Sequence, residues 1–549
     1  MKKTFLVIGL LLTLSFPAIK SLLQPGDFLS HDLTFHIVRQ ADMDKLLSEG
    51  QFPPRWSGDL NKGYGHPLFL FNYPAPAILG EIFYKLGFNL VDSVKAVMTF
   101  SILMAVVGMY LFLESLFSNR QMGPFLGAIF YLYAPVTFIN LYVSGEVGAV
   151  LAMGILPFIF WTIVRASQNK KWAIPLGSML VALLILSHNV TALMFSPIIL
   201  TFSLVLIYRS GNRQILFKKL SLMAFLGVGL AAFFWIPALY EKKFIVYDLI
   251  MKNFWLHQFP TFGQLIYSPW GHWLSRSATN SGMSRYIGLV HIFIFLILLI
   301  AIFVFRKRKE FLTWGIFVVV VFIISAFLML EVSTPVWENF PLIYLVQFPG
   351  RFSAVAVFAI SIGVALLIKY LPFNKIIFVV LLSFVLSANW DYLNTKQKID
   401  PGDTYYLTIN DTTTAFNEHL PIWAYLPQIP SPGKLEILNG EGNISILENK
   451  SVRVVAKINL STDSKIRFNQ FYFPGWVFII DNKQVKFPYQ ADSYQDGGES
   501  QGLPVFTLTK GSHLFEAEFI DTPDRRFADM VSLLGLICLG FISLKFLFR

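Results

Sequence analysis

The polar segment from 25 to 76 holds the residues whose types and spacing are best suited to chemistry. The whole chain is only 14% charged, yet this segment is rich in acids, histidines and arginines. If a helix begins near Ser30 or Asp32, His36 and Arg39 follow Asp32 by four and seven residues and share one face with it. A carboxylate, an imidazole and a guanidinium at one place can accept a proton and hold an anion. The same pattern is also typical of a capped surface helix whose charges face water, and spacing alone does not separate the two.

Other candidates come from turns and loops further along the chain. Glu146 lies at the outer end of an apolar segment with no basic neighbour, and a lone carboxylate there is costly unless it is used or paired. Arg351 follows a Pro-Gly turn, where its planar donor fork suits phosphate oxygens. An interfacial glutamate that reaches water, and an arginine that contacts lipid headgroups, are the alternatives. The candidate substrate-binding residues are His31, His36, Arg39, Arg55, His66, His188, Arg285 and Arg351.

The composition shows what kind of scaffold must hold these residues. Of 549 residues, 55% are hydrophobic and 16% aromatic, and the mean hydropathy is +0.58, which excludes an ordinary soluble domain. About 20 apolar residues cross a bilayer as a helix, and about twelve segments are candidates. We place them at 4–20, 95–117, 124–142, 146–165, 172–187, 190–208, 220–240, 288–305, 311–331, 353–370, 375–390 and 527–546. We expect the first to be retained as a span, since no clean signal-peptide cleavage site follows it.

The distribution of basic residues predicts the orientation of these spans. If the N-terminus is inside, the short cytoplasmic loops are the basic ones, such as 209–219 and 306–309. Both termini are then cytoplasmic in a plasma membrane, and the loops 21–94, 143–146, 241–287 and 332–352 face outward. The net charge of +11 is therefore a topology signal and does not indicate a nucleic-acid partner.

From about Tyr392 the sequence becomes polar, and short alternating segments separated by turns predict a β-sandwich of roughly 100 residues. The expected strands are 434–438, 444–447, 452–458, 466–473, 476–480, 505–509 and 513–519. We therefore expect a transmembrane domain at 1–391 with a long first outer loop at 21–94, an extracytoplasmic β-sandwich at 392–525 and a final transmembrane helix at 526–549. The aromatic run 471–476 fits core packing better than a sugar-binding platform.

This arrangement resembles the GT-C superfamily of integral-membrane glycosyltransferases. Its members carry an essential acid in a long first outer loop and often a second acid between spans three and four, where Asp32 and Glu146 stand here. The first loop, HDLTFHIVR followed by GQFPPRWSGDLNKGYGHPLFLFNYPAP, more closely resembles bacterial membrane proteins labelled 6-pyruvoyl-tetrahydropterin-synthase-related. The tail, FYFPGWVFIIDNKQV followed by LTKGSHLFEAEF, resembles the outer domain of YfhO-like membrane proteins. We see no pterin chemistry in the sequence.

The resemblance implies an inverting glycosyltransferase that moves a sugar from a polyprenyl-phosphate carrier to a lipid, glycan or protein acceptor on the outer face of the membrane. Asp32 would be the general base, Glu146 would position the acceptor or a metal, and Arg351 with Arg285 would hold the phosphate. Asp32 and Glu146 are also the candidate ligands of a divalent cation, Mg²⁺ or Mn²⁺. His31 precedes Asp32 where family members often carry a second acid, so metal binding stays open.

Two other classes of function are compatible with the sequence. A lipid-glycan transporter needs polar residues along a path through the spans, and these spans are almost free of charge. A non-catalytic assembly or glycan-binding protein would use the outer sandwich, and its first loop would be structural.

Overall fold

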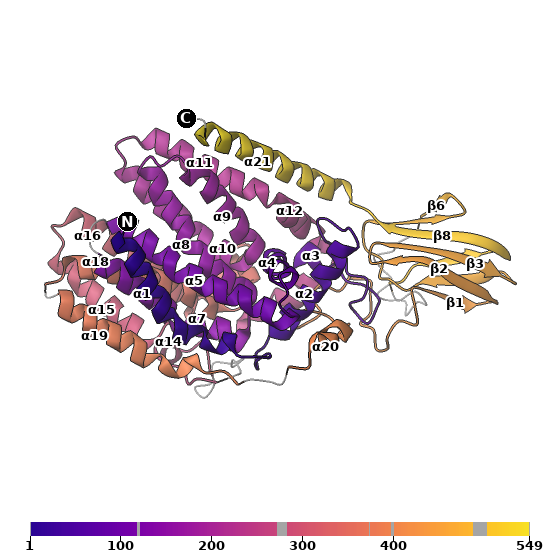
Figure 1. Ribbon diagram of the computed structural model, residues 1–549, viewed down its shortest axis with the longest axis horizontal. Coiled ribbons are helices and arrows are strands. Elements are labelled where there is room, and N and C mark those ends of the chain that lie inside the picture. Colours follow the sequence, from indigo (N-terminus) through magenta and orange to yellow (C-terminus); the bar gives the residue numbers. More distant parts are fainter. Residues whose placement is uncertain are drawn as a thin grey trace.

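The computed structural model consists of a helical bundle with a β-sheet domain at one end (Figure 1). It describes residues 2–117, 121–271, 283–372, 374–396, 400–486 and 502–547. In chain order the helices are α1 (Lys2–Ile19), α2 (Leu33–Ser48), α3 (Leu68–Phe71), α4 (Ala75–Lys85), α5 (Leu90–Phe117), α6 (Met122–Leu132), α7 (Pro135–Phe138), α8 (Val147–Ser167), α9 (Ala173–Ser187), α10 (Asn189–Arg209), α11 (Arg213–Leu230), α12 (Ala232–Glu241), α13 (Tyr247–Met251), α14 (Phe262–Ile266), α15 (Leu289–Val304), α16 (Lys309–Leu328), α17 (Thr334–Asn339), α18 (Ser353–Tyr370), α19 (Asn374–Ala388), α20 (Asp403–Thr408) and α21 (Pro523–Leu547). The short helical turns used below are the π-helical η2 (Ile139–Ser144), and η6 (Ile343–Val346) and η7 (Pro349–Phe352) of the 3-10 type.

Seven helices in the described part of the chain are long and apolar enough to cross a membrane, and nine spans result if two bent pairs each count as one. The protein is therefore a polytopic helical membrane protein. The bent pairs are α6 with α7 and η2, at 44°, and α11 with α12, at 65°. Three further predicted spans are the shorter helices α9, α15 and α19. A helix of 15 residues rises only about 22 Å, against about 30 Å of hydrocarbon, so by length the count is seven to nine where the sequence predicted about twelve.

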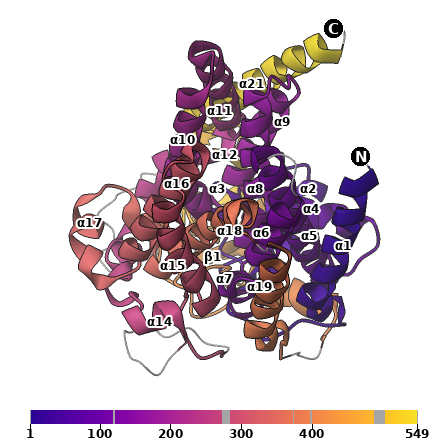
Figure 2. The same cartoon turned by 90° about the vertical axis from the view of Figure 1, so that its left-hand side faces the viewer.

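The bend between α11 and α12 is stabilised by the last helix. Ser532 of α21 accepts a hydrogen bond from the backbone N–H of Phe233 at 2.8 Å and donates one to the carbonyl of Gly229 at 3.1 Å. These backbone groups flank the break in the helix, where they lack their regular helical partners. α21 thus lies along α11 and α12, and Figure 2 shows these helices standing out from the bundle together with α9 and α10.

The β-sheet domain has two antiparallel sheets, one in the order β1-β4-β7 and one in the order β2-β3-β8-β5-β6. The strands are β1 (Leu435–Asn439), β2 (Gly442–Lys450), β3 (Arg453–Leu460), β4 (Ser464–Phe468), β5 (Trp476–Ile480), β6 (Lys483–Val485), β7 (Val505–Leu508) and β8 (Gly511–Phe519). Phe468 and Phe506 of the first sheet pack against Phe478 and Phe515 of the second. The predicted β-sandwich before a final apolar helix is confirmed, and only the three-residue β6 was not predicted.

The first loop shares a hydrophobic core with this sandwich. The Trp56 ring is fully buried, with ring centroids 6.2 Å from Phe473, 5.7 Å from Trp476 and 5.1 Å from Phe519. The aromatic run at 471–476 therefore contributes core side chains, as the sequence favoured. Figure 1 shows the first-loop helices α2 and α3 at the junction between the bundle and the strands. The sandwich thereby anchors the loop that carries Asp32.

Candidate functional site

The start of α2 is held against the turn that precedes α8. The backbone N–H of His31 donates to the carbonyl of Val143 at 3.0 Å, and that of Asp32 donates to the carbonyl of Ser144 at 2.8 Å. η2 ends there at Gly145, whose φ of 64° lies in the left-handed region that glycine adopts at little cost. These contacts bring the two predicted acids, one from the first loop and one from the turn before α8, to the same place.

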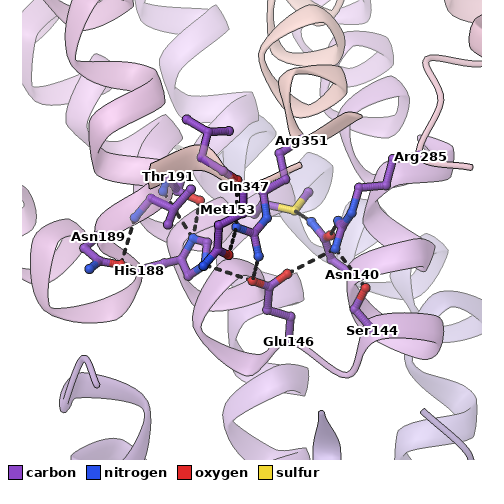
Figure 3. Close-up of polar contacts among 12 residues, drawn as sticks. Asn140, Ser144, Glu146, Met153, His188, Asn189, Thr191, Arg285, Gln347 and Arg351 are labelled. Atoms are coloured by element: carbon purple, nitrogen blue, oxygen red, sulfur yellow. Dashed lines mark hydrogen bonds and ion pairs between the residues drawn. The ribbon is translucent and has the colours of Figure 1, made fainter. Parts of the chain in front are cut away.

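Glu146 lies at the centre of a group that we call the arginine cluster, formed by the buried Glu146, His188 and Arg285 and the partly buried Arg351 (Figure 3). One carboxylate oxygen accepts hydrogen bonds from Arg351 Nη2 at 2.8 Å and His188 Nε2 at 2.9 Å, and the other accepts one from Arg285 Nη2 at 3.3 Å. His188 Nδ1 accepts the backbone N–H of Thr191 at 3.2 Å, so Nε2 carries the proton that points to Glu146. Burial alone would raise the pKa of Glu146, but the nearby Arg351, His188 and Arg285 hold it well below its usual value.

Both arginines of the cluster have most of their donors engaged by protein groups. Arg285 donates to the side-chain oxygens of Asn140 and Ser144 on η2, the latter at 3.0 Å. Arg351 Nη1 donates to the Gln347 side chain at 3.1 Å and to a backbone carbonyl at 3.0 Å. Glu146 is therefore the shared counter-ion of two guanidinium groups, and its expected contact with the acceptor or a metal stays a prediction.

A cavity of about 820 Å³ lies beside this cluster. Eight of the ten predicted site residues line it: His31, Asp32, His36, Arg39, Glu146, His188, Arg285 and Arg351. No hydrogen bond or ion pair engages the Asp32 carboxylate within the described ranges. Burial and the negative charge of Glu146 raise the pKa of Asp32 to about 6, although Arg39 and the cluster arginines oppose the shift. Burial and the charge of Arg39 lower the pKa of His36 well below its usual value, so this imidazole is neutral.

The other side of the cavity is apolar and continues to the outer surface of the bundle. Its lining side chains come from α10, from the bend between α11 and α12, and from the segment around η6: Leu193, Val228, Trp235, Leu239, Leu342, Leu345 and Phe348. Three of them are strongly exposed, Val228 at 41%, Leu239 at 52% and Leu342 at 46%. The cavity therefore joins a polar end at Asp32 to an apolar wall that reaches the surface.

Arg55 and His66 lie outside this cavity. Arg55 is buried and forms ion pairs with Asp521 at 3.1 Å and Asp529 at 2.7 Å, which ties the first loop to the start of α21. His66 is buried beside Asn61, at 3.2 Å, and burial lowers its pKa well below the usual value. The ion pairs of Arg55 join segments that sequence spacing does not connect, and the expected role of Arg55 and His66 in substrate binding stays a prediction.

Several lining residues were not singled out in the sequence. Lys242 follows α12 directly and Tyr247 begins α13, while Glu418 and His419 come from the segment between α20 and β1. The segment between α20 and β1 lines the cavity, but no charge pattern or spacing in its sequence indicates this. Only the fold reveals that a part of the chain assigned to the outer domain lines the site.

The described residues do not fit a divalent metal ion. No group of three or more His, Cys, Asp or Glu side chains in the described ranges is arranged to hold one. Both oxygens of Glu146 already accept hydrogen bonds from cationic or neutral donors, and two guanidinium groups beside it would repel a cation. We therefore derive no step through a metal.

Comparison with known proteins gives the family. The sequence model described as "6-pyruvoyl-tetrahydropterin synthase related domain; membrane protein" matches residues 82–395, more than half of the chain. The chain belongs to this family. In this 6-pyruvoyl-tetrahydropterin-synthase-related protein, the matched region contains the whole arginine cluster, whereas Asp32 and Arg39 precede it. The expected resemblance to this family is confirmed, and the match begins after the first-loop residues on which it was noted.

Individual relatives of this 6-pyruvoyl-tetrahydropterin-synthase-related protein are distant. An uncharacterized protein of Lactococcus lactis subsp. cremoris (strain MG1363) is 26% identical over 271 residues, which cover 46% of this chain and 42% of the relative. The apo oligosaccharyltransferase of Archaeoglobus fulgidus aligns at 14% identity with a TM-score of 0.43. The oligosaccharyltransferase AglB from the same organism, in complex with an inhibitory peptide and a dolichol-phosphate, aligns at 14% identity with a TM-score of 0.46. Each of these two alignments covers 76% of this chain and 60% of the archaeal chain.

Proposed function

We propose that this protein is a membrane glycosyltransferase that moves a sugar from a polyprenyl-phosphate carrier to a hydroxyl of a lipid, glycan or protein acceptor, with inversion at the sugar. The observation that carries the proposal is the cavity itself. It joins a carboxylate that no described residue engages, and a group of arginines, to an apolar wall that reaches the surface of the bundle. A sugar, a phosphate and a hydrocarbon chain each find matching surroundings there.

Asp32 is the general base of the proposed reaction. With a pKa of about 6 it is mostly ionised at neutral pH, and no donor in the described part of the chain engages its oxygens. It takes the proton of the acceptor hydroxyl as that oxygen attacks the anomeric carbon. The bond from this carbon to the carrier phosphate breaks, and the phosphate leaves with the electron pair. The arginines beside the cavity stabilise the negative charge on the leaving phosphate.

The apolar wall accounts for the lipid part of the donor. Side chains such as Leu193 and Val228 offer a hydrocarbon chain the same surroundings as the bilayer, and the exposed ones lie where a lipid can enter from the side. The charge pattern of the loops predicts that this end of the bundle is extracytoplasmic. Nucleotide sugars are made in the cytosol and would be absent on the outer side of the membrane. A lipid-linked sugar can be available there because its hydrocarbon chain lies in the bilayer.

The proposal is tested with purified protein reconstituted in lipid. The protein is supplied with a labelled polyprenyl-phosphate sugar or the matching nucleotide sugar, and with a membrane extract as the source of acceptor. We expect transfer only from the lipid-linked sugar. Asp32→Asn should abolish most of it, and the control Asp44→Asn should not. Asp44 lies on the same helix and pairs with Lys85 at the surface. Transfer from the nucleotide sugar without a lipid carrier, or near-normal transfer by Asp32→Asn, would overturn the proposal.

A further inference from the structure

The turn between η6 and η7 has a strained backbone at Gln347. Its φ is 64° and its ψ is −47°, and the N–H of Phe348 donates to the carbonyl of Val346 at 2.7 Å. This hydrogen bond across a single residue with a positive φ makes a γ-turn in its rare and strained form. A residue other than glycine keeps such a conformation only where the surrounding contacts hold it, which occurs mainly at functional sites. The contacts of this turn therefore indicate its role.

The side chain of Gln347 faces Arg351 of the arginine cluster (Figure 3). Its Oε1 accepts a hydrogen bond from Arg351 Nη1 at 3.1 Å, and its Nε2 donates one to the hydroxyl of Tyr247 at 3.2 Å. A guanidinium group has only donors, so the amide oxygen must be the atom that faces it. The two partners thus hold the amide in one orientation.

The backbone of the turn supplies a second acceptor. The carbonyl of Val346 accepts a hydrogen bond from Arg351 Nη1 at 3.0 Å, in addition to the one from Phe348. Glu146 holds the other end of the guanidinium group, at Nη2, at 2.8 Å. The group also lies over the Phe348 ring, 5.0 Å from its centre. The γ-turn therefore fixes one end and one face of Arg351.

A further contact fastens η6 to the segment that follows α12. The hydroxyl of Tyr344 donates to Asp248 at 3.0 Å and accepts from Lys242 at 2.6 Å. Together with the hydrogen bond between Gln347 and Tyr247, it attaches the turn at two points. Contacts of this kind are needed to keep a strained backbone in place. They hold the turn, and with it Arg351, in one position.

We infer that Gln347 is a positioning residue, which holds the guanidinium group of Arg351 in the orientation that the transfer reaction needs. The inference rests on the proposed function for the reaction, in which Arg351 meets the developing negative charge. A donor that is already oriented stabilises this charge without the cost of rearrangement. Without Gln347 the arginine would have to be oriented in the transition state. The turnover rate, kcat, should then fall more than the affinity for the donor.

Transfer from the lipid-linked sugar by reconstituted Gln347→Ala tests this effect. We expect kcat to fall by at least about tenfold, the scale of a lost hydrogen bond to a charged group. The KM for the donor should change by less than about threefold. The matched control is Gln168→Ala, which should keep the kcat of the parent protein. Gln168 accepts a hydrogen bond from Arg165 Nη1 at 3.0 Å, at the opposite end of α8 from Glu146.

A double-mutant cycle shows whether Gln347 acts through Arg351. Gln347→Ala should lower kcat in the parent protein but not in Arg351→Gln, which has no guanidinium group to position. A purely structural role would lower kcat equally in both. The same cycle followed by denaturant unfolding needs no substrate, and the two changes together should cost less than the sum of the single changes. Arg351→Gln leaves Glu146 with His188 and Arg285 as partners.

Glycine at the same position tests the strain of the backbone. Gln347→Gly and Gln347→Ala both lose the amide, but glycine adopts a positive φ at little cost. Gln347→Gly should therefore unfold at a higher denaturant concentration than Gln347→Ala, while its kcat is also lowered. This comparison holds even if Arg351→Gln folds poorly.

Four results would overturn the inference. They are a normal kcat in Gln347→Ala, an equal fall of kcat in the parent protein and in Arg351→Gln, additive costs in the unfolding cycle, and a Gln347→Gly variant that unfolds at a lower denaturant concentration than Gln347→Ala. If the parent protein transfers no sugar but the unfolding costs are not additive, only the proposed function is refuted, and Gln347 still positions Arg351. If transfer occurs and the costs are additive, only this inference is refuted.

Discussion

Replacing Glu146 by glutamine should lower the stability of the protein far more than the loss of an ordinary ion pair. The side chains of Arg285 and Arg351 are only 7% and 11% exposed, and that of Glu146 is 6% exposed. Removing one partner of a buried ion pair costs about 3–5 kcal/mol, because the remaining charge has no compensation. In Glu146→Gln one acceptor oxygen is retained, but an amide group faces a guanidinium. We expect a loss of about 3 kcal/mol or more in the free energy of unfolding.

Equilibrium unfolding in detergent, followed by tryptophan fluorescence along a denaturant series, measures this loss. Glu114→Gln is the matched control, since Glu114 pairs with Arg165 at 3.5 Å in the described part of the chain and is 35% exposed. Such a surface pair contributes at most about 1 kcal/mol. Adding Arg285→Gln to Glu146→Gln should cost less than the sum of the single changes, by about 0.5–3 kcal/mol. If Glu146→Gln and Glu114→Gln unfold at the same denaturant concentration, Glu146 does not hold the arginines in place.

Four further predictions concern Asp32, the pH dependence, the orientation of the spans and the core shared by the first loop and the sandwich. Asp32→Asn should lower transfer by about a hundredfold or more while unfolding at an unchanged or higher denaturant concentration, and a normal rate would exclude it as the base. Transfer by the parent protein should fall as the pH drops through about 6, where Asp32 gains a proton. Because the folded-state pKa of Asp32 lies above its unfolded value, the contribution of Asp32 to the free energy of unfolding should decline as the pH rises from about 4 to 6. Measuring the transfer rate and the free energy of unfolding over a pH series checks that they change in opposite directions. Reporter fusions should find residue 450 outside and residues 212 and 308 inside, and 212 and 450 on one side would contradict the orientation. Trp56→Ala should cost about 3–5 kcal/mol of unfolding free energy by denaturant titration, whereas a loss below about 1 kcal/mol would mean that the loop and the sandwich do not share a core.

Features that depend on local sequence were predicted well. Apolar runs marked the helices, and alternation marked seven of the eight strands, because both patterns are set by residues close in the chain. The sequence could also have predicted that four residues lie close together, namely Glu146, His188, Arg285 and Arg351. All four lie near the outer ends of predicted spans, and the positive-inside pattern assigns those ends to one side.

Pairing between distant residues could not be predicted. Arg55 was a binding candidate because it lies in the polar first loop, but its partner Asp529 lies 474 residues later in the chain. The reverse holds for Arg39, which looked like one member of a local triad. No ion pair engages it in the described ranges, and its guanidinium group instead donates to the backbone carbonyl of Thr413, far along the chain. Helix spacing specifies faces, but it does not say which charges remain unpaired once the faces meet.

The burial of Trp56 among side chains of the sandwich has a consequence for how the protein is made. Trp56 leaves the ribosome early, whereas Phe473 and Phe519 are synthesised only after most of the spans have emerged. Contacts this far apart in sequence form late, because a long stretch of chain must first be ordered. During most of synthesis the first loop therefore exposes a tryptophan that belongs in a core, and it depends on the membrane or on a chaperone to shield it. A nascent chain halted before residue 519 would carry a complete first loop but would lack Phe519, one of the core side chains against which Trp56 packs.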